Sequence, residues 1–232
     1  NSGEDVSDNS NDAAFYSVGV GTDRWGNNAQ AVNLTGSGYA TIPNIQMYEQ
    51  LENEFTISAW IKPNTVAGTQ AIVSKAGTGR DIVLRVDNGG KLTAHYYVSG
   101  YVWCTPVDAT IIANQWSHVA CTWDGTMLSV YHNGEKLHSV SPATLPNFTS
   151  NSWSIGALTA NGQETFSGQI DEVKVWHRHL SICELRSDIH ANWNLITEDN
   201  LLLCEGQSQS VSAPADMCSY LWTNDNSILE SS

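Results

Sequence analysis

The residues of this chain best suited to ligand chemistry are aromatic side chains placed beside a few polar groups. In residues 81–104, DIVLRVDNGGKLTAHYYVSGYVWC, alternate positions are apolar and the intervening ones carry polar or aromatic side chains. Aromatic rings stack on the C–H faces of sugars, while fixed polar groups read the hydroxyls. The alternative is that these rings only pack, as most Trp side chains do. The candidate ligand contacts are Trp60, Arg85, His95, Tyr97, Tyr101 and Trp103.

One acidic residue also calls for an explanation. In residues 169–176, QIDEVKVW, Asp171 is in phase with Val173 and Val175, so the pleat of a strand predicts an inward-facing carboxylate. A buried carboxylate is costly without a partner, and no Lys or Arg shares its row. A calcium ion, which prefers oxygen ligands, would solve this problem. The alternative is that Asp171 accepts backbone hydrogen bonds and holds no metal.

Catalytic patterns are weak by comparison. Retaining sugar hydrolysis needs two carboxyl groups about 5 Å apart, but Asp171 and Glu172 are adjacent in a strand and point to opposite faces. A polysaccharide lyase could use His95 and Tyr97, which share a face, with Arg85 nearby. The chain has no G-x-S-x-G motif for a nucleophilic serine. We therefore expect binding rather than catalysis, with a polysaccharide-cleaving hydrolase or lyase as the alternative.

The elements that must position these residues are mostly β-strands. Charged residues make up only 15% of the chain, and nine Trp and eight Tyr favour strands. Period-2 alternation predicts strands at 55–63, 81–87, 91–98, 116–123 and 166–176, with a hairpin at Asn133-Gly134. One helix is predicted in residues 180–193, with Ser181 as N-cap and Glu184 completing a capping box.

Charge and hydropathy exclude two classes of partner. The formal net charge is −14 and the chain has only ten Lys and Arg residues, which argues against nucleic-acid binding. No apolar run approaches the roughly 20 residues that span a bilayer, and no signal segment opens the sequence, so we expect a mature or excised fragment. The five cysteines lack the spacing of a zinc site and favour disulfides in an oxidising, extracellular compartment.

The disulfide pairing is open among several possibilities. Cys104 and Cys121 could join neighbouring strands, and Cys204 and Cys218 could close a small loop. Cys183 would then be left over. Leaving one of five cysteines out gives 5 × 3 = 15 pairings, which the sequence does not separate.

Three stretches in order carry a family resemblance: DRWGNNAQAVNLTGSGYATIPN; FTISAWIKP with QWSHVACTWDGTMLSVYHNGE; and FSGQIDEVKVWHRHLSICEL. Together they resemble the laminin-G-like members of the concanavalin A-like lectin and glucanase superfamily. The resemblance implies an all-β, two-sheet antiparallel jelly-roll sandwich, often with one structural calcium. Its implied calcium ligands here are Asp171, Asp8, Asn11, Gly36 and Ser37.

The resemblance also sets the expected organisation and function. Residues 1–192 would form the jelly-roll domain, and 193–232 a linker and partial immunoglobulin-like module. The expected function is a secreted or cell-surface lectin-like module that binds a glycan or polysaccharide and serves cell adhesion. A second possibility is a protein-binding spacer module whose partner is a cell-surface protein.

Overall fold

The structure, a computed structural model, divides into two compact units, Asn1–Leu180 and Ser181–Ser232. It describes residues 3–5, 7, 11–43, 51, 53–76, 81–144, 146, 148–190, 221–224 and 227–230. The predicted boundary at residue 192 lies outside these residues.

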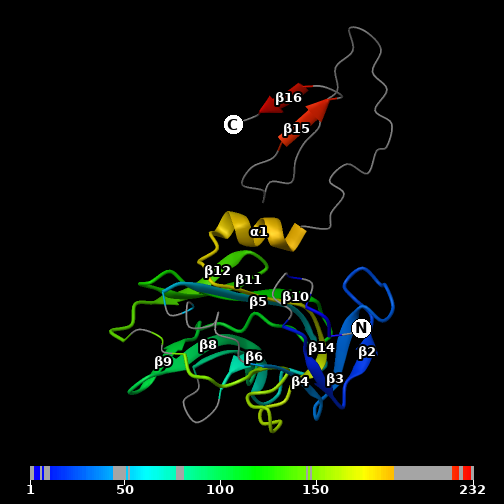
Figure 1. Cartoon of the computed structure of the whole chain (residues 1–232), viewed down its shortest axis with the longest axis vertical. Coiled ribbons are helices and arrows are strands. Elements are labelled where there is room, and N and C mark those ends of the chain that lie inside the picture. The colour runs from blue at the N-terminus through cyan, green and yellow to red at the C-terminus, as the bar shows by residue number, and fades with distance from the viewer. Residues whose placement is uncertain are drawn as a thin grey trace. The chain divides into compact units, whose positions relative to one another are not determined.

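The first unit is a sandwich of two antiparallel sheets, which appear as two layers in Figure 1. The expected all-β jelly-roll fold is therefore confirmed. Sheet A runs in the order β1 (Ala14–Tyr16), β4 (Tyr39–Ile42), β13 (Trp153–Ile155), β6 (Gln70–Lys75), β7 (Ile82–Asp87), β8 (Lys91–Tyr97) and β9 (Tyr101–Cys104). Sheet B runs in the order β12 (Glu135–Val140), β11 (Leu128–His132), β10 (Ser117–Trp123), β5 (Phe55–Pro63), β14 (Ser167–Trp176), β3 (Ala31–Thr35) and β2 (Gly19–Gly21).

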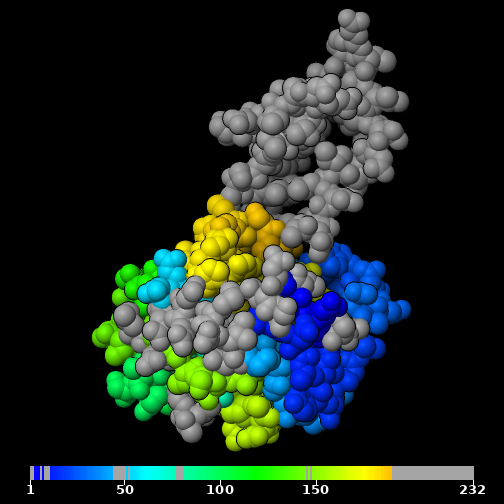
Figure 2. All heavy atoms as spheres, viewed as in Figure 1, coloured from blue at the N-terminus to red at the C-terminus, as the bar shows by residue number. Residues whose placement is uncertain are grey.

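The core between the sheets follows the predicted alternation. Phe55, Ile57 and Ala59 of β5 are fully buried in one hydrophobic cluster with apolar side chains of β7 and β8. Strands that are far apart in the chain also pair within sheet A: β4 pairs with β13, which follows it by more than a hundred residues. In Figure 2 the N-terminal segment (blue) and the segment after residue 150 (yellow-green) accordingly lie side by side.

Two local predictions are confirmed by backbone geometry. Asn133 and Gly134 both have positive φ, as a tight turn between β11 and β12 requires. The helix α1 (Ile182–His190) belongs to the second unit and begins with the predicted capping box. The backbone N–H of Ser181 donates to Glu184 Oε2 at 2.8 Å, and the N–H of Glu184 donates to Ser181 Oγ at 3.3 Å.

The second unit also contains a pair of antiparallel strands, β15 (Leu221–Asn224) and β16 (Ser227–Glu230). An immunoglobulin-like module in residues 193–232 stays a prediction, because most of that segment lies outside the described residues. No helix in the part of the chain that the structure describes is long and apolar enough to span a membrane.

The cysteine pairing differs from the expectation. Cys104 and Cys121 are free thiols buried in the core, so the predicted bridge between neighbouring strands is wrong. Burial raises the pKa of Cys104 to about 12, and it raises that of Cys121 further. Cys183, which had no partner in the expected pairing, is disulfide-bonded. Cys204 and Cys218 lie outside the described residues.

Candidate functional site

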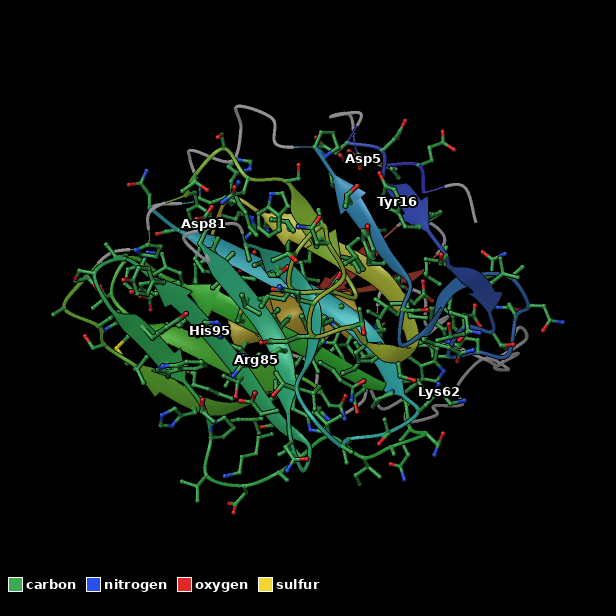
Figure 3. All side chains as sticks on the ribbon, turned by 90° about the horizontal axis from the view of Figure 1, so that it is seen from below. Asp5, Tyr16, Lys62, Asp81, Arg85 and His95 are labelled. Carbon is green, nitrogen blue, oxygen red and sulfur yellow. The ribbon has the colours of Figure 1, made fainter. Side chains whose placement is uncertain are left out.

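An aromatic platform lies on the outer face of sheet A. We use this name for Arg85 of β7, His95 and Tyr97 of β8, and Tyr101 and Trp103 of β9. Their sequence neighbours Leu84, Ala94, Tyr96 and Cys104 belong to the core cluster, so strand alternation turns the platform side chains away from the core. Figure 3, which views this sheet from outside, shows Arg85 and His95 on the adjacent strands β7 and β8, where His95 pairs with Val83, two residues before Arg85.

Cross-strand pairing brings the platform rings together. His95 is the register partner of Trp103, and Tyr97 is that of Tyr101. Ring centroids are 4.3 Å apart for His95 and Trp103, 5.0 Å for Tyr97 and Tyr101, and 5.2 Å for Tyr101 and Trp103. Three of the rings face solvent: Tyr97 is 38% exposed, Tyr101 45% and Trp103 41%. The result is a contiguous row of exposed rings at the sheet edge.

His95 has a different role from these three rings. It is 0% exposed and packs beneath Trp103 and Tyr101. Because a general base must come within hydrogen-bond reach of the substrate, a buried His95 is poorly placed to act with Tyr97 as a lyase pair. Its position instead supports the rings above it.

Arg85 contributes a positive charge beside the rings of the platform. Its guanidinium carbon lies 4.9 Å from the centroid of the Trp103 ring. Arg85 Nε lies 2.8 Å from Asp87 Oδ1, and Nη1 lies 3.3 Å from Glu164 Oε2. Asp87 also accepts a hydrogen bond from the Thr93 hydroxyl, and that hydroxyl lies 3.2 Å from Thr105 Oγ1. A polar network thus borders the exposed rings.

Sequence reasoning missed the two acids of this network. Asp87 could have been found, because it lies two residues after Arg85 and therefore on the same face of β7. Glu164 comes from the loop between β13 and β14, and no sequence pattern links it to Arg85, 79 residues away.

Trp60, the sixth predicted ligand contact, does not join the platform. It lies on β5 in sheet B, whereas the other five residues lie in sheet A. The guanidinium carbon of Arg24 lies 4.3 Å from the Trp60 ring centroid and 3.5 Å from that of Trp25. Arg24 Nη1 also forms an ion pair with Glu172 Oε1 at 2.6 Å. We call these four residues the Arg24 cluster.

The predicted inward orientation of Asp171 is wrong. A β-bulge lies between Asp171 and Lys174, so the alternation is interrupted there. Asp171 is the register partner of Trp60, whose neighbours Ala59 and Ile61 face the core. The Asp171 carboxylate therefore projects on the outer side of sheet B, toward Arg24 and Glu172.

The carboxyl group of Asp171 is nonetheless perturbed. Burial raises the pKa of Asp171 from its usual 3.8 to about 6. A hydrogen bond from the backbone N–H of Glu172 and the charge of Arg24 oppose this rise, whereas the charges of Glu172 and Asp23 add to it. The burial that the sequence suggested is therefore present, but it arises at the outer face.

Two of the five predicted calcium ligands, Gly36 and Ser37, lie far from Asp171. Asp8 lies outside the described residues. Gly36 directly follows Thr35, which pairs with Ser167 at the start of β14. Asp171 lies four residues farther along β14, a distance of about 13 Å. Calcium–oxygen distances are only about 2.5 Å. Gly36 and Ser37 therefore cannot share an ion with Asp171, and no group of three or more His, Cys, Asp or Glu in the described residues forms a metal site.

Asn11 keeps a feature that suits a cation. Its side-chain oxygen Oδ1 is buried and has no hydrogen-bond partner. The Asn11 N–H donates to Asp5 Oδ2 at 2.8 Å, so an amide oxygen and a carboxylate belong to the same N-terminal loop. Desolvation alone would raise the pKa of Asp5, but hydrogen bonds from Asn11 and Ser7 outweigh it and hold that pKa below 3.8. The loop offers the oxygen donors that calcium prefers.

Comparisons with known structures show the fold. The chain is similar to the binding domain of Paraclostridial Mosquitocidal Protein 1, with 17% identity, a TM-score of 0.68, and coverage of 82% of this chain and 50% of that one. It is also similar to Domain 4 of AbnA, a GH43 extracellular arabinanase from Geobacillus stearothermophilus solved in complex with arabinotriose (16% identity, TM-score 0.54, 76% and 87% covered). A third similar structure is Trypanosoma rangeli sialidase in complex with sialic acid (20% identity, TM-score 0.57, 77% and 29% covered).

The chain spans about half the length of the mosquitocidal binding domain. A comparison with curated protein sequences gave no significant match. The family model of the concanavalin A-like lectin/glucanases superfamily matches residues 34–186, well over half of the chain. With the two-sheet sandwich described above, this match shows that the chain belongs to the concanavalin A-like lectin/glucanase superfamily, in its laminin-G-like branch.

Proposed function

We propose that this chain is an extracellular carbohydrate-binding module and that the aromatic platform of sheet A contacts the sugar. The observation that carries the proposal is the row formed by Tyr97, Tyr101 and Trp103, three adjacent rings that each expose more than a third of their surface. Exposed aromatic rings beside fixed polar groups match the two faces of a sugar, which are apolar C–H and polar hydroxyl.

Contacts from neighbouring side chains hold the platform in place. His95 supports the rings from below, and ion pairs hold Arg85 in place beside Trp103. Side chains that are already fixed before binding lose little conformational entropy when the ligand arrives. The arrangement therefore favours recognition by a surface that is formed in advance.

Two structural neighbours with this fold were solved with sugars. Domain 4 of the arabinanase is a module of an extracellular enzyme and was solved with arabinotriose, and the sialidase was solved with sialic acid. Low identity means that these likenesses reach the fold alone. The platform residues of this chain carry the proposal.

Binding without cleavage is part of the same proposal. The residue pair that the sequence offered for lyase chemistry has its histidine buried under Trp103. Asp171 and Glu172 lie in sheet B, away from the sheet that holds the platform. Incubation with a bound polysaccharide should release no new reducing ends and produce no unsaturated uronate absorbance. Product formation that scales with the concentration of this chain would overturn this part of the proposal.

A structural calcium is a further part of the proposal, located in the N-terminal loop instead of at Asp171. The buried Oδ1 of Asn11 and the ionised carboxyl of Asp5 would be among its ligands. The ion would supply a fixed charge that satisfies these oxygens and stabilises the loop. An adhesion role on the cell surface is the expected biological setting.

The binding proposal is tested by glycan-array screening and by affinity electrophoresis in gels that contain soluble polysaccharides. We expect retardation by at least one polysaccharide, and we expect Trp103→Ala to weaken it tenfold or more. A large side chain that becomes buried against a ligand contributes about 1.5–3 kcal/mol, and the loss of that contribution weakens binding tenfold or more.

The matched control is Trp25→Ala. Trp25 is 43% exposed and stacks on an arginine, as Trp103 does, but it lies in the Arg24 cluster. We expect Trp25→Ala to bind like the wild-type chain. Equal binding by the wild-type chain and Trp103→Ala would remove the platform from the proposal, and the absence of binding to every glycan would overturn it.

A further inference from the structure

We infer that the platform selects uncharged glycans and rejects glycans that carry carboxylate or sulfate groups, because its arginine is already neutralised by two fixed acids. This inference rests on the proposed function and names the ligand class of the same site. An exposed arginine beside aromatic rings would ordinarily suggest an anionic sugar. The two acidic partners of Arg85 instead favour an uncharged sugar.

Arg85 is charge-paired and largely buried. Its Nε lies 2.8 Å from Asp87 Oδ1 and its Nη1 donates to Glu164, while Trp103 lies 4.9 Å from the guanidinium carbon. Its side chain is only 11% exposed. The summed formal charge of Arg85, Asp87 and Glu164 is +1 − 1 − 1 = −1, and Lys91, the register partner of Asp87, brings the sum to 0. A carboxylate on the ligand would therefore lose its hydration without gaining a net attraction from this group.

Glu164 is held in this position by its backbone. Its φ is +49°, a left-handed conformation that a residue with a side chain adopts rarely and at some cost. Its carbonyl oxygen accepts a hydrogen bond from Ala71 N at 2.8 Å, at the point where a bulge interrupts the pairing of β6 with β7. The hydrogen bond to β6 therefore fixes the backbone that carries the Glu164 carboxylate.

Asp87 is fixed by the neighbouring strand. The hydroxyl of Thr93 on β8 donates to Asp87 Oδ2 at 2.7 Å. Asp87 and Glu164 still expose 22% and 28% of their side chains. Both carboxylates can therefore accept hydrogen bonds from sugar hydroxyls while they repel an anionic group.

The nearest other cation on this face is Lys91, the register partner of Asp87 on β8. Lys91 therefore lies at the end of the polar network that is farthest from the rings, four residues or about 13 Å along the strand from His95. That separation from His95 exceeds the Debye length of about 8 Å at physiological ionic strength, so Lys91 offsets the charge of Asp87 but contributes little at the rings.

The test compares neutral and anionic probes. Binding is measured on a glycan array and by electrophoresis in gels containing neutral polysaccharides (arabinan, galactomannan, β-glucan) or anionic ones (polygalacturonate, alginate), at 0.15 M salt. We expect the wild-type chain to bind neutral probes and to prefer them at least tenfold over anionic ones. Glu164→Gln should increase binding to anionic probes at least threefold and leave the best neutral probe within about twofold.

Two controls separate this effect from net charge. Glu135→Gln makes the same charge change on β12 of sheet B, and Lys91→Gln removes the cation that faces Asp87. Glu135→Gln should leave the preference unchanged, and Lys91→Gln should not increase binding to anionic probes. Wild-type binding to anionic probes as strong as to neutral ones, or a Glu164→Gln variant that matches Glu135→Gln, would overturn the inference and leave the proposed function standing. Failure to bind any glycan would overturn the proposed function itself, and this inference with it.

Discussion

An arginine that stacks on tryptophan and pairs with a glutamate occurs beside each of the two sheets, with different surroundings. Beside sheet A the set is Arg85, Trp103 and Glu164, and beside sheet B Arg24 lies against two tryptophans and pairs with Glu172. Both glutamates have positive φ, at +49° and +44°. The residue types alone therefore do not distinguish a binding surface from a structural tie.

Exposure and neighbours make the difference. Trp103 continues into a row of exposed tyrosines, so a flat surface is available to a ligand. Arg24 instead lies in contact with both Trp25 and Trp60, its side chain is only 6% exposed, and its Nη2 and the Nε1 of Trp60 are buried without a hydrogen-bond partner. The Arg24 cluster resembles an interior ion pair, and the platform resembles a prepared surface.

The largest expected effect is a difference in stability between the two arginines. Arg24→Met should lower the free energy of unfolding by roughly 3 kcal/mol, because it leaves Glu172 largely buried without its main partner. Arg85→Met should cost only about 1 kcal/mol, since Asp87 keeps its hydrogen bond from Thr93 and Glu164 is 28% exposed to water. Urea unfolding followed by tryptophan fluorescence measures both. Equal losses of stability in the two variants would contradict the difference between the Arg24 cluster and the platform.

The second effect concerns Asp171, beside the Arg24 cluster. A pKa raised from 3.8 to about 6 means that the folded state binds the proton more tightly than the unfolded state. This carboxyl group therefore costs stability above pH 6, and the cost disappears as the pH falls toward 4. Asp171→Asn should raise stability by about 2 kcal/mol at pH 7 and have no effect near pH 4.

Thermal melts at pH 7, 6, 5 and 4 of the wild-type chain and Asp171→Asn provide the measurement. The same series tests the alternative that calcium binds at Asp171. In that case the substitution would destabilise the chain at pH 7, which is the opposite sign.

The third effect sharpens the description of the platform. Tyr101→Ala should weaken glycan binding about fivefold, which is roughly 1 kcal/mol for one exposed ring in a stacked row. Tyr16→Ala is a matched control on the same sheet: Tyr16 is 46% exposed and stacks on Tyr39 at 4.9 Å, but it lies on β1 at the opposite edge. Figure 3 shows Tyr16 away from Arg85 and His95. Weaker binding by both variants in the same titration would mean that the ligand surface is not confined to the platform.

The smallest expected effect is that of metal removal. If calcium binds the N-terminal loop, a chelator should lower the melting temperature by a few degrees, as expected for about 1 kcal/mol in a chain of this size. Asn11→Ala should abolish the response to chelator, whereas Asp171→Asn should retain it. A melting temperature that is unchanged by chelator would remove calcium from the proposal.

Much of the fold was predictable because strand and helix signals are local. The row Phe55, Ile57, Ala59 and Ile61 alternates with polar residues, and all four face the core as the pattern indicates. The capping box at Ser181 and the Asn133-Gly134 turn depend on residues within a few positions of one another. Five of the six predicted ligand residues meet on one face for the same reason, since adjacent antiparallel strands carry them at matching positions.

The tertiary structure alone decided what depends on long-range pairing and on irregular backbone. One extra residue in β14 moved Asp171 to the outer face, and bulges leave no clear mark in a sequence. Trp60 had the right alternation but lies in the other sheet, since alternation specifies a face and not which sheet the strand joins. Glu164 reaches Arg85 only because a distant loop returns to β6. The sequence by itself determined that exposed rings would line one side of the strands 91–104. Whether their arginine remained free to meet a ligand depended on side chains that folding brings together.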